Sequence, residues 1–133
     1  MRSVSGRPAT RQERGIIGVV GGVGPYAGLD LVRKILSQTR ARSDQEHLSV
    51  AMLSLPGEIA DRTEYLLGKG TRSPAAAIAR VVLDLERIGA TAIGIPCNTA
   101  HAPGIFDEVL QRLVKARSSV QLIHMIEEVA CHL

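Results

Sequence analysis

Aromatic residues are scarce in this chain, whose 133 residues include two tyrosines, one phenylalanine and no tryptophan. The core must therefore be built from Val, Ile, Leu and Ala, a composition that suits parallel strands covered by helices. Because no aromatic residues are interleaved with basic ones, a nucleic-acid platform is not expected. Hydrophobic residues still make up 45% of the sequence, so we expect one globular domain.

Cysteine and long apolar runs are also scarce. The two cysteines, Cys97 and Cys131, lie in a chain without an apolar export signal, so we expect free thiols and a cytoplasmic protein. Cys131 is interpreted as a structural residue of the last helix. No apolar run approaches the ~20 residues of a membrane-spanning helix. No second Cys/His pair has ligand spacing, and we expect neither a metal nor a membrane partner.

The net charge of +3 belongs to one end of the chain. Residues 1–14 contain four arginines and one acidic residue, whereas basic and acidic residues balance from Gly15 onward. We expect residues 1–14 to form a disordered basic tail, although their Arg/Ser bias is also compatible with a transit peptide. The folded domain is expected to span residues 15–133.

Short apolar runs alternate with helical patterns along the rest of the chain. Such alternation predicts an α/β fold, a doubly wound parallel sheet of about four strands with right-handed crossovers. The expected strands are residues 16–20, 48–55, 91–95 and 120–123, and the expected helices are residues 25–39, 63–67, 75–88, 105–116 and 125–132. Ser73 is predicted to cap the third of these helices, with Pro74 at its first position.

The most informative stretch is Pro96-Cys97-Asn98-Thr99-Ala100-His101, which follows directly on an apolar strand. In open α/β sheets, ligands bind at the carboxyl ends of the strands. A buried Cys is often only a small hydrophobic residue, but the adjacent amide and hydroxyl of Asn98 and Thr99 would be wasted in a plain core. We therefore predict that Cys97 is catalytic. His101 has two open interpretations: it activates the thiol or polarises a substrate, or it only caps the next helix.

A glycine-rich loop, Gly21-Gly22-Val23-Gly24-Pro25, follows the first strand. It loosely resembles a dinucleotide fingerprint, but Leu55-Pro56-Gly57 occupies the corner where that fingerprint requires an acid. The loop is better interpreted as a tight turn whose N–H groups, with the following helix N-terminus, face an anion such as a carboxylate.

Asp61-Arg62-Thr63 lies in the connection after the second strand, at the same edge of the sheet. Such a triplet usually provides a helix cap and a surface salt bridge. In the functional interpretation, the guanidinium of Arg62 binds a substrate carboxylate through two hydrogen bonds.

Taken together, these motifs resemble the N-terminal half of the cofactor-independent aspartate/glutamate racemase family. The resemblance also rests on Asp44-Gln45-Glu46-His47 and His124-Met125-Ile126-Glu127-Glu128, and it covers the chain from about Ile16. It implies one of two similar α/β domains with the active site between them, no cofactor, and a small dicarboxylic amino acid as substrate. A homodimer is expected.

The resemblance also implies roles for individual residues. Cys97 would be the acid/base of the first domain, and Arg62 would bind the side-chain carboxylate. Asn98 and Thr99 would bind the region of the α-carboxylate. The backbone from Gly22 through Val23 to Gly24 would line the pocket.

The second-domain cysteine of the family, in a Gly-Cys-Thr-Glu type of motif, has no counterpart in this sequence. Inversion needs a proton donor on the face opposite the base. We therefore expect an aspartate or glutamate racemase that is truncated and impaired on its own. The alternatives are a one-cysteine decarboxylase or isomerase of the wider superfamily, and an inactive module for dicarboxylate binding or dimerisation.

Overall fold

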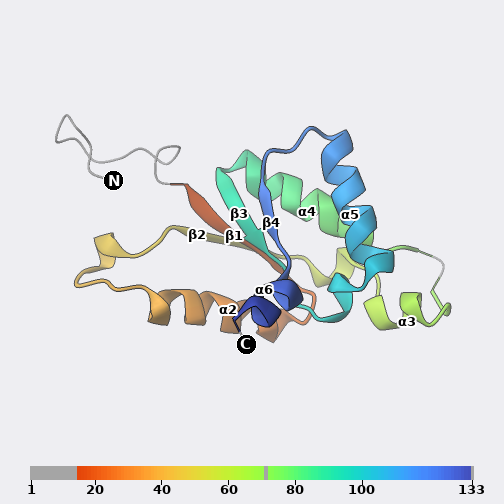
Figure 1. Ribbon diagram of the computed structural model, residues 1–133, viewed down its shortest axis with the longest axis horizontal. Helices are drawn as coiled ribbons and strands as arrows, with labels where there is room; N and C mark the ends of the chain where they lie inside the picture. Colours follow the sequence, from red (N-terminus) through yellow and green to blue (C-terminus); the bar gives the residue numbers. More distant parts are fainter. Residues whose placement is uncertain (1–14, 71, 133) are drawn as a thin grey trace.

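A four-stranded parallel sheet forms the centre of the computed structural model, which describes residues 15–70 and 72–132 (Figure 1). The strands are β1 (Ile16–Gly21), β2 (Val50–Ser54), β3 (Ala90–Gly94) and β4 (Gln121–Ile123). They lie in the order β2-β1-β3-β4, and all three pairings are parallel. The predicted fold class is therefore confirmed. The predicted basic tail, residues 1–14, lies outside the described residues.

The helices fall where the periodicity predicts them, with ends that differ by one or two residues. They are α2 (Pro25–Gln38), α3 (Arg62–Leu66), α4 (Ala75–Arg87), α5 (Pro103–Lys115) and α6 (Met125–Cys131). Short 3-10 turns occur at η1 (Asp44–Glu46), η2 (Pro56–Glu58) and η3 (Thr99–His101). The strand expected from residue 48 begins later, because its pairing with β1 starts at Val50.

Helices α4 and α5 pack against each other and cover one face of the sheet (Figure 1). The apolar residues of α4 recur at helical spacing and are buried, as are those of α5 that face them. Ile78, Leu85 and Ile105 are fully buried, and each such side chain stabilises the fold by about 1.5–3 kcal/mol relative to exposure. Most of the hydrophobic core therefore lies on this face.

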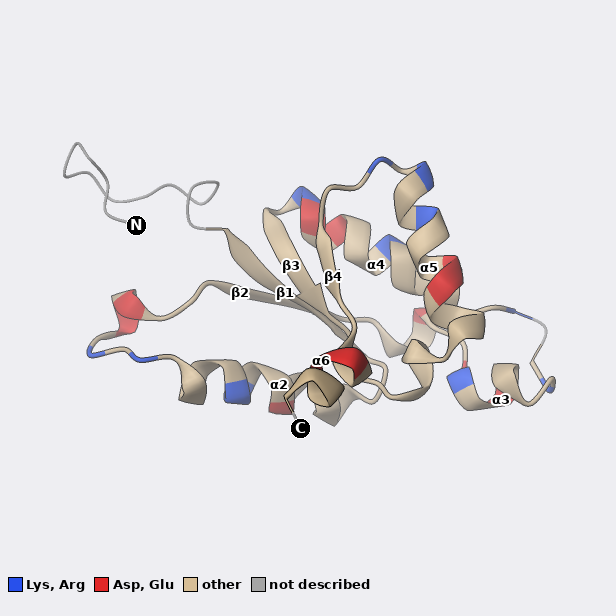
Figure 2. Cartoon of the chain, viewed as in Figure 1, with Lys and Arg blue, Asp and Glu red and all other residues tan. Residues whose placement is uncertain are grey.

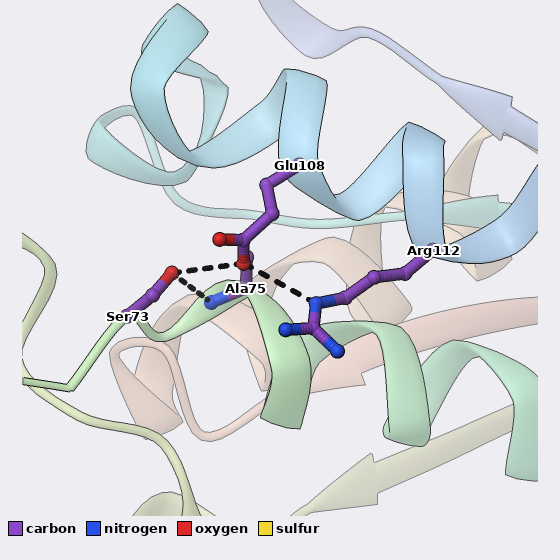
Figure 3. Close-up of polar contacts among 4 residues, drawn as sticks. All are labelled: Ser73, Ala75, Glu108 and Arg112. Atoms are coloured by element: carbon purple, nitrogen blue, oxygen red, sulfur yellow. Dashed lines mark hydrogen bonds and ion pairs between the residues drawn. The ribbon is translucent and has the colours of Figure 1, made fainter.

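A polar cluster joins the start of α4 to α5 (Figure 3). The Ser73 hydroxyl accepts a hydrogen bond from the Ala75 N–H (3.2 Å) and donates one to Glu108 Oε2 (3.0 Å). Arg112 Nε donates to the same carboxylate oxygen over 3.3 Å. Ser73 thus satisfies a free backbone donor of α4, as its sequence position predicts. The helix begins at Ala75, where its predicted range begins, but Pro74 occupies the N-cap position that was predicted for Ser73.

The other face of the sheet carries α2, and its cover is much thinner. Gly28 is the one buried residue of α2, and a Cβ there would lie 2.9 Å from Met52 Sδ, so the glycine allows close contact with β2. Leu29 of α2 is 56% exposed and Leu36 is 40% exposed. The two faces of the sheet therefore differ strongly in the apolar area that they bury.

Charged residues of both signs are distributed over the helices and loops, and the strands carry none (Figure 2). In the described part of the chain, no helix has both the length and the apolar character needed to cross a membrane.

Candidate active site

The strand order places the candidate site between β1 and β3. From β1 the chain passes through α2 to β2 on one side, and from β3 it passes through α5 to β4 on the other side. The connections therefore diverge at the carboxyl ends of β1 and β3, which is the position where open α/β sheets bind ligands. The glycine loop 21–25 follows β1 and the Cys97 segment follows β3, so the structure brings the two predicted segments to one place.

Cys97 is half-buried on the loop that leaves β3. Its N–H donates to the carbonyl of Ile95 over 2.8 Å, which forms a tight turn at the strand end. Its Sγ lies 3.2 Å from Thr99 Oγ1, close enough for a hydrogen bond. Asn98 is exposed and Thr99 is half-buried. The thiol therefore has a hydroxyl partner within its own turn and an amide beside it that remains open to a ligand.

His101 is 3% exposed and lies at the end of the η3 turn. Its Nδ1 is 2.7 Å from the carbonyl oxygen of Cys97. Its ring stacks on Phe106 at 5.1 Å between centroids and meets the ring of His124 edge-on at 4.8 Å. Burial lowers the pKa of His101, the hydrogen bond to Cys97 opposes this shift, and the nearby His124 lowers the pKa further.

Glycine is required in the β1–α2 loop. Gly22 and Gly24 have φ values of 79° and 81°, which L-residues with side chains rarely adopt. The side chain of Val23 is buried in the core, so its backbone is the part available to a ligand. Gly24 is the N-cap of α2, and no side chain caps the free N–H groups of the first turn. The loop thus presents backbone donors and the positive end of the helix dipole.

Arg62 is the first residue of α3, directly after the cap residue Asp61, whose carboxylate accepts from the Glu64 N–H at 2.8 Å. The predicted helix cap is thus present. Arg62 Nη1 makes a long hydrogen bond (3.4 Å) to the carbonyl of Ala60. Its Nε is buried without a partner, and its guanidinium makes no ion pair with any residue in the described ranges.

Helix α3 packs beside the η3 turn that follows Cys97. The structure therefore brings the helix that carries Arg62 to the same edge as the thiol. A half-buried cation with an unused donor can bind a carboxylate.

The sequence reasoning assigned no role to Phe106 or to the contact of His124 with the site. His124 directly follows β4, so its position at the carboxyl edge was a signal available in the sequence. Cys131 is exposed on α6 and is not part of the core. The interpretation of Cys131 as a structural residue is therefore wrong. No group of three or more potential metal ligands gathers within the described residues.

Comparison with known proteins agrees with this architecture. The model of the Asp/Glu/hydantoin racemase family matches residues 20–133. The aspartate racemase of Picrophilus torridus has 35% sequence identity and a TM-score of 0.70, over 84% of this chain and 44% of its own. An aspartate racemase homologue from Pyrococcus horikoshii OT3, 22% identical, has the same fold with a TM-score of 0.65, over 89% of this chain and 48% of its own.

The chain thus spans a little under half the length of these two solved structures. The matched region contains the glycine loop from Gly21, Arg62 and the Cys97 segment. On the evidence of the family match and the fold, this chain belongs to the Asp/Glu/hydantoin racemase family.

Proposed function

We propose that this chain supplies one half of an aspartate or glutamate racemase, with Cys97 as the group that exchanges a proton with the substrate Cα. The proposal rests above all on the position of Cys97, a half-buried thiol at the carboxyl ends of β1 and β3, where the connections of the sheet diverge. The family match and the 35% identity to an aspartate racemase support the same class of reaction.

In the proposed reaction, the Cys97 thiolate forms an S–H bond as the substrate Cα–H bond breaks. The electron pair of that bond passes into the α-carboxylate, which becomes an enolate-like dianion. The Thr99 hydroxyl, 3.2 Å from Sγ, donates a hydrogen bond to the thiolate form and orients it. Return of a proton to Cα restores the amino acid, and no redox step or cofactor is needed.

The substrate carboxylates have separate partners. Arg62, whose buried Nε lacks a protein partner, binds the side-chain carboxylate. Asn98, the backbone N–H of Thr99 and the backbone of the glycine loop bind the α-carboxylate, where the uncapped first turn of α2 adds a favourable dipole. The α-carboxylate is also where negative charge develops, so these donors stabilise the transition state more than the ground state.

Inversion requires a second proton donor on the opposite face of the Cα plane. The matched part of the Picrophilus torridus enzyme is 44% of its length, and we propose that the second donor belongs to a region equivalent to the remainder. The 133 residues by themselves then exchange the Cα proton but return it to the face that it left. The exposed apolar residues of α2, such as Leu29 and Leu36, favour association into a homodimer.

The test is proton exchange of L-aspartate and L-glutamate in D2O, followed by NMR for deuterium at Cα and by chiral chromatography for inversion. We expect deuterium incorporation without inversion by the wild-type chain. Cys97→Ser abolishes the exchange, whereas Cys131→Ser, a matched change at an exposed thiol, preserves it. Arg62→Ala weakens substrate binding by about 10- to 100-fold, the range for losing a hydrogen bond to a charged group, and Arg80→Ala, an exposed arginine of α4, does not.

Each other outcome contradicts a specific part of the proposal. Inversion by this chain alone refutes the half-enzyme interpretation. Release of CO2 identifies a one-cysteine decarboxylase. Binding of aspartate that depends on Arg62, with no exchange by the wild-type chain, identifies an inactive dicarboxylate-binding module.

A further inference from the structure

We propose that His101 is a positioning residue for Cys97: its buried ring, held between Phe106 and His124, fixes the loop that carries the thiol by binding the carbonyl of Cys97. This inference rests on the role proposed above for Cys97. It adds that Phe106 and His124 hold the His101 ring, and that this ring in turn holds the backbone of the Cys97 loop.

The first observation is the hydrogen bond between His101 Nδ1 and the Cys97 carbonyl oxygen, at 2.7 Å. A carbonyl oxygen can only accept, so Nδ1 must carry the proton. In the neutral ring, Nε2 is then a bare acceptor. Nε2 is buried and has no hydrogen-bond partner among the described residues. The backbone of Ile123 also lies near the ring and raises its pKa, so the tautomer assignment rests on the hydrogen bond of Nδ1.

The second observation is the set of rings that fixes the orientation of His101. Phe106, in the first turn of α5, stacks on it with an interplanar angle of 22°. His124 contacts both rings edge-on, at 4.8 Å from His101 and 4.6 Å from Phe106 between centroids. His124 is itself held, because its Nδ1 accepts the Glu127 N–H at the start of α6 (3.2 Å). Phe106 of α5 and His124 of the β4–α6 turn therefore fix the orientation of the His101 ring, and this ring binds the Cys97 loop.

The third observation separates positioning from activation of the thiol. The partner of Cys97 Sγ is Thr99 Oγ1, within its own turn, and His101 binds the backbone carbonyl instead. A general base for the thiol would need a ring nitrogen within hydrogen-bond reach of the sulfur. Nδ1 is committed to the carbonyl, and burial keeps the pKa of His101 below its ordinary value, so the ring stays neutral at pH 7.

The test begins with the tautomers, which two-dimensional ¹H–¹⁵N NMR of the imidazole nitrogens measures without substrate. We expect the Nδ1–H tautomer for His101 and the opposite Nε2–H tautomer for His124, whose Nδ1 is an acceptor. Cys131→Ser in all samples leaves Cys97 as the single thiol. An Nε2–H tautomer or a protonated ring for His101 at pH 7 overturns the proposal.

Three substitutions of His101 then test the hydrogen bond. His101→Asn keeps an N–H donor close to the position of Nδ1, whereas His101→Gln moves the donor toward the position of Nε2 and His101→Leu removes it. We expect amide hydrogen exchange of residues 97–102 to accelerate about tenfold in the Gln and Leu variants, the upper range for loss of one hydrogen bond. The Asn variant and His47→Gln, a control at an exposed histidine, remain close to wild type. Equal acceleration in the Asn and Gln variants overturns the proposal.

The kinetic measurement uses the Cα–H exchange reaction. A misplaced thiol lowers kcat by about 10- to 100-fold and leaves KM nearly unchanged, because the carboxylate partners are untouched. The Asn variant recovers most of kcat. If the Leu variant keeps the wild-type kcat, positioning by His101 is refuted while the proposed function stands. If the wild-type chain shows no exchange but the tautomers and loop protection are as expected, the proposed function fails and the structural hold on Cys97 stands.

Discussion

The β1–α2 loop allows a sharp test of the structure, because three glycines in and near it face different surroundings. A Cβ at Gly22 would lie 2.9 Å from the backbone nitrogens of both Leu55 and Pro56, at a φ of 79°. A Cβ at Gly24 would meet nothing closer than 3.6 Å, at a similar φ of 81°. A Cβ at Gly57 would have no neighbour within 4 Å, and its φ is not in the positive range. Alanine at position 22 therefore adds both backbone strain and a clash, and alanine at position 24 adds backbone strain alone. Alanine at position 57 adds neither.

The magnitudes follow from these surroundings. Gly→Ala stabilises by about 0.4–1 kcal/mol through the unfolded chain, and this contribution is common to all three variants. Backbone strain in a sparsely populated region costs about 1–3 kcal/mol, and a new contact that close to rigid backbone costs about 1–3 kcal/mol more. Relative to Gly57→Ala, we expect Gly24→Ala to lose about 2 kcal/mol and Gly22→Ala about 4 kcal/mol.

The assay is urea unfolding followed by circular dichroism, with the three variants and the wild-type chain fitted to a shared m-value. Differences between variants remove the unfolded-state contribution, so they report strain and clash directly. If Gly22→Ala and Gly24→Ala differ by less than about 0.5 kcal/mol, the ordinary margin for substitutions without a specific mechanism, the close approach of the two loops is wrong.

Three further predictions concern the uneven sheet, the α4–α5 cluster and the buried ring. Ile78→Ala is expected to destabilise by about 2–5 kcal/mol and Leu29→Ala by less than about 1 kcal/mol, as measured by urea unfolding, because Ile78 is fully buried and Leu29 is 56% exposed. Ser73→Ala is expected to cost about 1 kcal/mol through loss of its bonds to α4 and Glu108, and near-equal thermal midpoints for the variant and wild type contradict this. His101 has a folded-state pKa below its unfolded value of about 6.5, so the unfolded chain binds the extra proton and stability falls as pH drops below about 6.5 toward the folded pKa. In His101→Asn this decline, about 1.4 kcal/mol per unit of pKa difference, is expected to disappear.

Much of the fold was predictable because local patterns agree with the tertiary arrangement. The short apolar runs contain the strands, and the apolar spacing of α4 matches the face that it buries. The uneven cover of the sheet was not predictable, because α2 also has apolar residues at helical spacing, among them Leu29 and Leu36. Periodicity identifies an apolar face, but it does not state whether another element covers that face.

The candidate site divides in the same way. The Cys97 segment and the glycine loop share an edge, as the alternation of strands and helices predicts. The role of the His101 ring could not be predicted from the sequence. A histidine four positions after Cys97 is equally compatible with a residue that caps the next helix and with a base that activates the thiol. The η3 turn directs the ring back to the Cys97 carbonyl, and two partners distant in sequence, Phe106 and His124, fix it there.

The strand order also determines when the chain can fold during its synthesis. β1 is internal to the sheet and pairs with β2 soon after both leave the ribosome, but its second partner is β3, with Ile17 beside Ala92. Some 75 residues separate these partners, which at translation rates of about 5–20 residues per second amounts to roughly 4–15 s. Throughout that interval the nascent chain exposes the unpaired backbone N–H and C=O groups along one edge of β1. The β1–β3 pairing, which brings the glycine loop and the Cys97 segment to one edge, must therefore wait for the synthesis of β3. Until then the open edge of β1 can pair with another chain.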